Sequence, residues 1–432
     1  MRTLLVLLCA LSATACRPAA SRPPTRIVLI VVDTLRRDFL SCYGGTARTP
    51  NMDRLAARGQ RFTNAVGSFH QTSMSMGALF TGRTPSIEST DPATPLPWTG
   101  KTWCGLARFG TNDAGSECLP RSLPTLAEIL LDAGMRTVGI TSNDLMFRPA
   151  GFDRGFETWT EIGRQPHVTA RGHMAFFARL AIEARKAERV MQAAIEAVAA
   201  HREERLFLYV HFMDVHDWWV PGDRTRTYNH HENYRRAVEA FDTALGTFLE
   251  SLEREGVLAD AAVILTADHG ESLGEWHPIA SMPVHFGNPA YEPVLRVPLI
   301  VAPAYFEDPT RMVRSEDVFG MICDLAGSHQ RPARPASDLA TDEIFLTEAQ
   351  YQTYRRGRWK TIRRRSDGAT MLFDVEADPQ ETVDVAAPNE PVGRTHAVRI
   401  AELSRALGTT AGASGTLSPQ DQERLRALGY VR

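Results

Sequence analysis

The sequence predicts an α/β protein built on a doubly wound, mostly parallel β-sheet flanked by helices, with a small C-terminal α+β subdomain. Two short apolar segments, Ile27–Val32 and Val263–Leu265, are each followed within three residues by an aspartate. Continuous apolar runs of this length are typical of strands buried on both faces of a parallel sheet. A third observation is that helix-compatible segments lead into further strand-like runs at residues 134–140 and 206–210.

Length and charge limit the architecture and the partners. The chain has 432 residues, of which 43% are hydrophobic and 23% are charged, an ordinary globular composition. This length exceeds one typical domain, so we expect a catalytic domain at residues 26–327 and a C-terminal subdomain at residues 338–432, joined by a linker. The net charge of −3, without a basic tract, argues against nucleic-acid binding.

The first residues have the pattern of an export signal. Arg2 precedes the apolar run Leu4–Leu11, and small residues follow it directly before Cys16. This arrangement resembles a bacterial lipobox, so residues 1–16 are predicted to be a signal peptide with Cys16 as the lipidated residue. Residues 17–25 would then be a tether, and the protein would be anchored by lipid in the bacterial cell envelope. The alternative is an ordinary signal peptide cleaved near Ala15.

Export also suggests a disulfide. Cys104 and Cys118 bracket a polar, glycine-containing stretch, and an oxidising compartment favours a bond between them. Cys42 and Cys323 lie in apolar surroundings and are expected to be buried thiols.

Helix signals recur between the strands. Thr49 followed by Pro50 predicts a helix start, and Gly82 is a suitable C-cap for a helix over Ser75–Phe80. Longer helices are predicted over residues 181–201, 234–252 and 398–407. Short strand-like runs between residues 343 and 375 predict a small antiparallel sheet in the C-terminal subdomain.

Chemically useful side chains stand at the predicted strand ends. Asp33 ends the first strand, and Asp268 with His269 ends the later one, which is where open α/β sheets bind ligands. A carboxylate pair with an imidazole could bind a metal ion, although Asp268 and Glu271 could instead be the capping pair of a following helix. The hydroxyl of Thr72, at a helix N-terminus, could be a cap or a nucleophile facing an anionic substrate.

The ordered motifs resemble the sulfatase family of the alkaline phosphatase superfamily. They cover nearly all of the chain after the tether and comprise V-V-D33-T-L-R, T49-P-N-x-D-x-L-A, the segment from Thr72 to Gly82 with its L-F-T-G-R ending, V-H-F-M-D-V-H216, A-D268-H-G-E, Y291-E-P-V-L-R-V-P-L-I-V, L372-F-D-V-E-A-D-P and L425-R-A-L-G-Y. The resemblance implies an α/β fold of the alkaline phosphatase and sulfatase type.

The sequence departs from the sulfatase pattern at the nucleophile. Thr72 occupies the position of the cysteine or serine that sulfatases oxidise to formylglycine, and Met74 and Met76 replace the proline and arginine of that motif. Threonine carries a methyl group on Cβ and cannot be oxidised to an aldehyde, so no formylglycine is expected. Thr34 replaces the second aspartate of the usual pair. These departures are similar to the threonine-nucleophile members of the superfamily, such as phosphoethanolamine transferases and phosphodiesterases.

The resemblance implies one divalent metal ion held by four residues: Asp33, Thr72, Asp268 and His269. Two carboxylates, an imidazole and a hydroxyl favour Zn²⁺, with Ca²⁺ as a possible alternative. It also implies that His216 and Arg36 bind the substrate anion and that His285 is a catalytic residue that protonates the leaving group, whereas His277 is a weaker candidate.

The function predicted from these residues is exported, metal-dependent hydrolysis of sulfate or phosphate esters through Thr72. Phosphate is chemically favoured, because a sulfothreonine lacks the aldehyde-forming exit of formylglycine. The substrate would be a small-molecule, glycan or lipid ester, and the membrane contact would be the lipid anchor. Two alternatives remain: a phosphoethanolamine-type transferase, and a non-catalytic surface lipoprotein that retains the fold.

Overall fold

The computed structural model describes residues 23–85, 123–143, 145–146, 148–163, 185–219, 229–279, 290–330, 339–347 and 351–406, together with Leu119, Glu183, His285 and the pairs 101–102 and 415–416. The predicted signal peptide, Cys16 and both cysteines of the predicted disulfide lie outside these residues.

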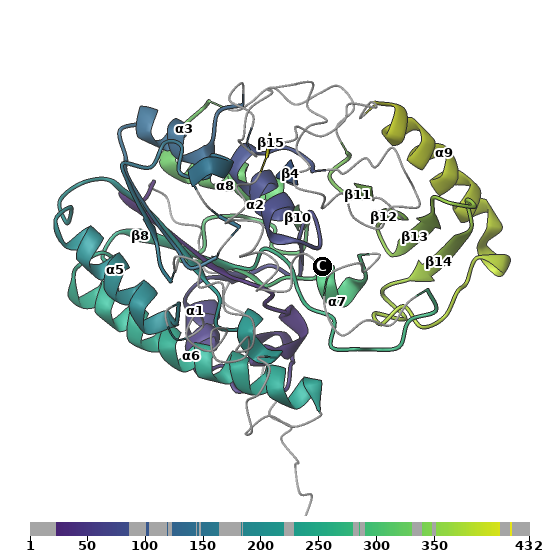
Figure 1. The fold of residues 1–432 in the computed structure, drawn as a ribbon, viewed down its shortest axis with the longest axis horizontal. Coiled ribbons are helices and arrows are strands. Elements are labelled where there is room, and N and C mark those ends of the chain that lie inside the picture. The colour runs from purple at the N-terminus through teal and green to yellow at the C-terminus, as the bar shows by residue number, and fades with distance from the viewer. Residues whose placement is uncertain are drawn as a thin grey trace, which may run out of the picture.

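A seven-stranded sheet forms the centre of the molecule (Figure 1). Across the sheet the strands are β2 (Gln60–Arg61), β9 (Leu299–Ala302), β8 (Ala261–Thr266), β1 (Arg26–Val32), β7 (Leu206–Phe212), β5 (Arg136–Thr141) and β6 (Thr158–Glu161). The five strands from β8 to β6 are parallel, whereas β9 and β2 continue the sheet in antiparallel pairings. The predicted mostly parallel sheet is therefore confirmed.

Burial explains why the apolar runs became central strands. Every residue of β7 and β8 is buried, as are Ile27–Val32 of β1. Helices cover both faces, so these strands have no solvent-facing side that would require polar residues.

The helices form two layers (Figure 1). One layer contains α1 (Pro50–Arg58), α5 (Ala187–Ala199) and α6 (His230–Arg254), and the other contains α2 (Thr72–Thr81), α3 (Leu126–Asp132) and α8 (Ser315–Ala326). Phe241 and Phe248 of α6 pack edge-to-face on Phe212 of β7, which fixes this long helix on the sheet. The short helix α7 (Glu292–Leu295) precedes β9.

Helix ends differ from the predictions by a few residues. Within the helix predicted over residues 181–201, the structure has α5 at Ala187–Ala199, and α6 extends beyond both ends of the predicted 234–252 segment. Pro50 is the first residue of α1 as predicted, but the Thr49 hydroxyl bonds to Ser41 and Asp53 instead of capping the helix.

The C-terminal subdomain is a four-stranded antiparallel sheet with one helix, as predicted. Its strands β11 (Glu343–Thr347), β12 (Tyr351–Arg356), β13 (Trp359–Arg364) and β14 (Thr370–Asp374) pair in chain order, and α9 (Glu390–Ala406) lies beside them (Figure 1). Two minor pairings complete the described elements: β3 (Asn64–Val66) with β10 (Met312–Arg314), and β4 (Lys101–Thr102) with β15 (Gly415–Thr416).

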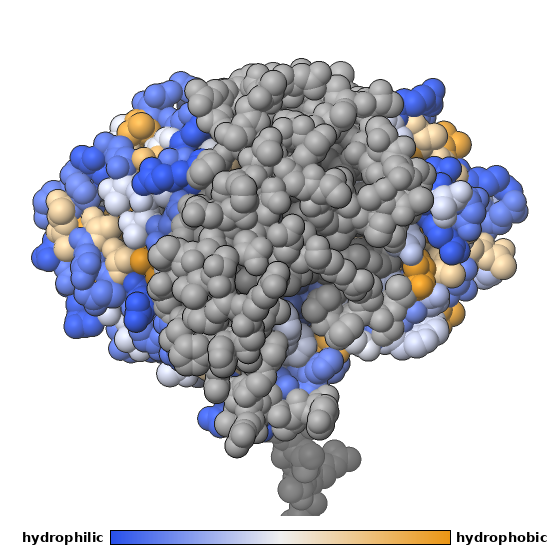
Figure 2. Space-filling view, viewed as in Figure 1, coloured by the Kyte–Doolittle hydropathy of each residue, from blue (hydrophilic) through white to orange (hydrophobic). Residues whose placement is uncertain are grey.

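The described part of the surface is mostly hydrophilic on the face shown in Figure 2, with small separate hydrophobic patches over the helical layers and over the C-terminal subdomain. None of the helices among the described residues combines the length and the hydropathy needed to cross a bilayer.

Candidate functional site

Two aspartates meet at the carboxyl edge of the parallel sheet. In the pairing of β1 with β8, Ile30 lies beside Leu265, so Asp33 and Asp268, each three residues further on, emerge at the same level. Both side chains are completely buried. Adjacent parallel strands end at one edge of the sheet, and this is why residues 235 positions apart in order of the chain can share a site.

A strained turn completes the carboxylate pair. Thr34 follows Asp33 with a φ of 58°, in the left-handed region that β-branched residues rarely adopt. This conformation directs the Thr34 N–H toward Asp268, whose Oδ1 accepts it at 3.1 Å and also accepts the His269 N–H at 2.8 Å. The Tyr234 hydroxyl donates to the Thr34 carbonyl at 2.6 Å and holds the turn in place. Local strain of this kind is often stored at functional sites.

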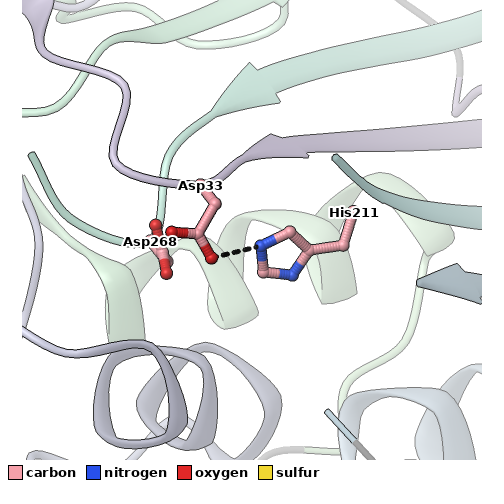
Figure 3. Close-up of side chains that lie close together, drawn as sticks. All are labelled: Asp33, His211 and Asp268. Carbon is pink, nitrogen blue, oxygen red and sulfur yellow. Dashed lines mark hydrogen bonds and ion pairs between the residues drawn. The ribbon is translucent and has the colours of Figure 1, made fainter. Parts of the chain in front are cut away.

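His211 joins the two aspartates. The strand predicted over residues 206–210 continues to Phe212, so His211 is the penultimate residue of β7 and does not follow the strand; it pairs with Val31 and Thr141 of the neighbouring strands. Its Nε2 lies 3.2 Å from Asp33 Oδ2 (Figure 3). Asp33, His211 and Asp268 each offer a ligand-type atom within 4.8 Å of one another.

Asn143 is a site residue that the sequence analysis missed. It follows β5 by two residues, and its Nδ2 donates to Asp33 Oδ2 at 2.5 Å. The signal that could have found it is the rule applied to Asp33 and Asp268, because β5 is another parallel strand ending at the same edge.

One oxygen of each carboxylate lacks a hydrogen-bond donor among the described residues. Asp33 Oδ1 and Asp268 Oδ2 are buried and accept no hydrogen bond from the part of the chain that the structure describes, which is costly unless another positive partner is present. Burial disfavours the Asp33 carboxylate, but the hydrogen bond with His211 and the nearby His216 and His269 lower its pKa. Burial and the charge of Asp33 raise the pKa of Asp268. The two carboxylates are buried side by side, and each has one oxygen without a hydrogen-bond donor in the described part of the chain. This arrangement is suitable for binding a divalent cation.

Thr72 is the first residue of α2 and points into this group. Its hydroxyl lies 3.3 Å from Asp33 Oδ2, 3.4 Å from Asn143 Nδ2 and 3.5 Å from His269 Nε2. The helix begins three residues earlier than predicted, with Gln71 at the N-cap position, and it ends at the predicted C-cap Gly82, whose φ is 66°. The hydroxyl therefore does not cap its own helix and instead faces the site, where the free N–H groups of a helix N-terminus attract anions.

His269 is held with one ring nitrogen facing Thr72. The Nδ1–H donates to the Gly270 carbonyl at 2.7 Å, which leaves the Nε2 lone pair on the site side. A Cβ on Gly270 would lie 2.1 Å from the Pro293 carbonyl oxygen, so glycine is required there. The alternative in which Asp268 and Glu271 cap a helix is wrong, because residues 268–279 form none.

His216 is buried beside its neighbour Asp217, whose Oδ1 lies 3.3 Å from the His216 Nδ1. Arg185 forms a two-pronged ion pair with the same carboxylate. Burial opposes protonation of His216, but the hydrogen bond with Asp217 and the charges of Asp33 and Asp217 together raise its pKa. A His216 imidazolium would suit an anionic substrate.

His285 lies close to both His269 and His216. Its ring centre is 4.5 Å from that of His269 and 5.8 Å from that of His216. Glu271 lies 3.1 Å from the His285 Nδ1 and also accepts the Trp218 indole N–H at 3.2 Å, so Glu271 is a contact residue that sequence reasoning assigned only to capping. Burial lowers the pKa of His285 to about 4, despite Glu271.

The Arg36 guanidinium is buried and bonded to several groups of the protein. Its guanidinium makes a bidentate pair with Asp38, an ion pair with Glu275 and a hydrogen bond to the Glu271 carbonyl at 3.1 Å. The buried charge is thus matched within the protein, and the substrate-binding role of Arg36 stays a prediction.

Solved structures with a similar fold indicate the class of this protein. A solved 2-O GAG sulfatase matches with a TM-score of 0.64 at 17% identity, covering 93% of this chain and 100% of that one. A protein in the alkaline phosphatase superfamily from Vibrio parahaemolyticus matches with a TM-score of 0.57 at 17% identity, covering 89% of each chain. These likenesses show an alkaline phosphatase-type α/β fold.

The family model described as Sulfatase matches residues 25–328, and the chain belongs to the sulfatase family of ester hydrolases. It is 29% identical to human arylsulfatase A over 58% of this chain and 53% of that protein. It is 22% identical to the N-acetylgalactosamine-6-O-sulfatase of Bacteroides thetaiotaomicron over 85% of this chain and 91% of that protein. The chain thus spans about half the length of the first relative and nearly all of the second.

Proposed function

We propose that this protein is a metal-dependent hydrolase of anionic esters that uses Thr72 as its nucleophile. The observation that carries the proposal is the position of the Thr72 hydroxyl. It is buried at the N-terminus of α2, it does not cap that helix, and it lies 3.3 Å from Asp33 and 3.5 Å from His269.

The residues at the carboxyl edge fit one divalent cation. Asp33, Asp268, His269 and Thr72 would hold it, with the two bare carboxylate oxygens as its strongest ligands. A mixed set of carboxylates and imidazole favours Zn²⁺ over Ca²⁺, which prefers more oxygen ligands. When bound, such a cation lowers the pKa of a neighbouring hydroxyl and neutralises charge on the attacked ester.

The protein side chains supply the remaining functions. The Thr72 hydroxyl donates toward Asp33 Oδ2, which aims an oxygen lone pair away from Asp33. His216, held by Asp217, would bind an ester oxygen as a cation. His285, held by Glu271, would exchange a proton with the leaving group. Because burial lowers the pKa of His285 to about 4, we expect it to take up a proton only when the anionic ester enters beside it.

Threonine chemistry favours phosphate esters over sulfate esters, although the relatives are named for sulfate esters. A sulfated formylglycine hydrate expels sulfate by collapsing to the aldehyde, whereas a sulfated threonine has no such exit. A phosphothreonine can be attacked at phosphorus by water or by an acceptor alcohol. Phosphoethanolamine-type transfer is accordingly the second candidate, and the same threonine favours it.

We further propose that the protein is exported, lipidated at Cys16 and anchored in the bacterial cell envelope, with a disulfide between Cys104 and Cys118. These proposals rest on the apolar run before Cys16 and on the spacing of the cysteines. The substrate would then be a small-molecule, glycan or lipid ester of the envelope or its surroundings.

Replacement of Thr72 tests the proposal. Thr72→Ala should lower turnover of a phosphate ester by several orders of magnitude at unchanged stability, because covalent catalysis is lost. Thr72→Ser should keep measurable activity because the oxygen remains. Ser73→Ala, the next residue of the same helix, is the matched control and should retain near-normal turnover.

Aryl sulfate, phosphate monoester and phosphodiester substrates should be compared with Zn²⁺ and Ca²⁺, and the adduct located by mass spectrometry after rapid quenching. A phosphoryl group on the peptide containing Thr72 is the expected result. Near-normal turnover of Thr72→Ala would remove the nucleophile and, with it, the preference for phosphate.

A further inference from the structure

A buried tyrosine contacts His211 next to the Asp33 and Asp268 carboxylates. Tyr209 of β7 is completely buried and is surrounded by aromatic rings: Trp159 stacks parallel to it at 6.1 Å, and Phe80 of α2 meets it edge-to-face at 5.1 Å. Among the described residues, its hydroxyl has one hydrogen-bond partner, the Nδ1 of His211, at 2.8 Å. Because the aromatic rings around it are apolar, this nitrogen is the acceptor for the tyrosine O–H.

The direction of this hydrogen bond fixes the proton on His211. Burial and the charges of Asp268 and Asp33 raise the pKa of Tyr209 well above its usual value, so the hydroxyl keeps its proton. A buried donor left without an acceptor costs about 1–3 kcal/mol, and the Tyr209 O–H therefore donates to His211 Nδ1. An imidazole whose Nδ1 accepts a hydrogen bond carries its N–H on Nε2, which here is the atom 3.2 Å from Asp33 Oδ2.

The two oxygens of Asp33 consequently differ. Oδ2 accepts from three donors: His211 Nε2, Asn143 Nδ2 and the Thr72 hydroxyl. Oδ1 is buried and accepts a hydrogen bond from none of the residues that the structure describes. Figure 3 shows the His211 ring pointing at one oxygen of Asp33 while the other oxygen lies on the side of Asp268.

We infer that Tyr209 and His211 are positioning residues that hold Asp33 by Oδ2 and present Oδ1 to the cation, and that His211 is not itself a metal ligand. Proximity alone would group His211 with the ligands, since its ring nitrogen is within 4.8 Å of both carboxylates. The donated hydrogen bond decides against this, because a protonated ring nitrogen has no lone pair to offer. The inference rests on the cation site of the proposed function, but not on which ester is hydrolysed.

Zinc X-ray absorption spectroscopy of the zinc-loaded protein tests the ligand assignment, because imidazole ligands give a distinct outer-shell scattering pattern. His211→Gln should retain the imidazole scattering of the wild type, and His269→Gln should lose it. Loss of imidazole scattering in His211→Gln would show that His211 is a ligand and would overturn the inference.

Zinc affinity tests the positioning role without any measurement of activity. Tyr209→Phe and His211→Gln should each weaken zinc binding by about ten- to a hundredfold, as is usual for partners that orient a metal ligand. The matched control is Tyr354→Phe, which removes another buried tyrosine hydroxyl, bonded to Glu343 in the C-terminal subdomain. This variant should bind zinc as tightly as the wild type, and circular dichroism should confirm that all variants are folded.

The outcomes separate the inference from the proposed function. If Tyr209→Phe binds zinc as tightly as Tyr354→Phe, the positioning role is refuted while the cation site stands. A wild-type protein that binds no zinc would refute both. Zinc binding with the expected pattern but without ester hydrolysis would leave the inference standing and refute the proposed activity.

Discussion

Lys360 joins the C-terminal subdomain to the catalytic domain through a fully buried ionic cluster. Its Nζ donates to the Ala290 carbonyl at 2.7 Å and lies 3.2 Å from Glu292 and 2.9 Å from Glu381. Arg355 also pairs with Glu292, at 3.0 Å, whereas among the described residues Lys360 is the cation that pairs with Glu381. Lys360→Met should therefore leave Glu381 as an uncompensated buried acid.

Removing one partner of a buried ion pair typically lowers the free energy of unfolding by about 3–5 kcal/mol. We expect a loss in this range for Lys360→Met at alkaline pH, because Glu381 is held in place. Its Oε2 accepts the Glu292 N–H at 2.6 Å, so the side chain cannot turn away without losing a second bond. Burial already raises the pKa of Glu381 even with Lys360 present. Removing Lys360 should raise this pKa further, so the folded state would bind a proton that the unfolded state releases. The destabilisation should accordingly be larger at pH 8 than at pH 5.

Urea unfolding at both pH values measures the effect. Lys360→Met should lose about 3–5 kcal/mol at pH 8 and less at pH 5, and adding Glu381→Gln should recover part of the loss, because glutamine needs no counterion. Arg356→Met is the control, since Arg356 pairs with Asp342 at 3.2 Å on the surface, with side chains 56% and 53% exposed, and should cost less than about 1 kcal/mol. Equal effects of Lys360→Met and Arg356→Met at pH 8, or no recovery in the double variant, would refute the reasoning.

Two further predictions concern pH and redox state. Burial, with the charges of Asp217 and Glu188, raises the pKa of Asp214 to about 7, and its carboxylate accepts the Ala187 N–H at 3.0 Å. The folded state therefore binds more protons than the unfolded state between about pH 4 and 7, so stability should fall as pH rises through this window, by up to about 4 kcal/mol. Asp214→Asn keeps the acceptor and should abolish this fall in urea unfolding at pH 5 and pH 8; an unchanged pH dependence would contradict the assignment. Non-reducing peptide mapping should find Cys104 linked to Cys118, a bond expected to stabilise the fold by roughly 3 kcal/mol, and two reduced thiols would dismiss it.

The local sequence was sufficient to predict the central strands and the two aspartates that follow them. The runs Ile27–Val32 and Val263–Leu265 are apolar without alternation, which only a strand covered on both faces tolerates, and this was sufficient to predict a mostly parallel sheet. Since parallel strands end at one edge, the positions of Asp33 and Asp268 followed from the same reasoning. The C-cap Gly82 was also predictable, because a left-handed residue after a helix favours glycine.

The hydrogen-bond partners within the site could be known only from the tertiary structure. His211 could be placed within β7 only by its pairing with two neighbouring strands, and its proton by the hydroxyl of Tyr209 in an aromatic cluster drawn from separate elements. Arg36 carries the charge expected of a substrate-binding residue. One of its carboxylate partners, Glu275, is 239 positions away in the sequence and could not be predicted from it. Hydrophobic periodicity reports the local environment of a residue, whereas hydrogen-bond partners depend on which distant segments the folded sheet and its helices bring together. The sequence therefore predicted which residues follow β1 and β8, whereas the hydrogen-bond partners of the buried polar groups depended on the tertiary structure.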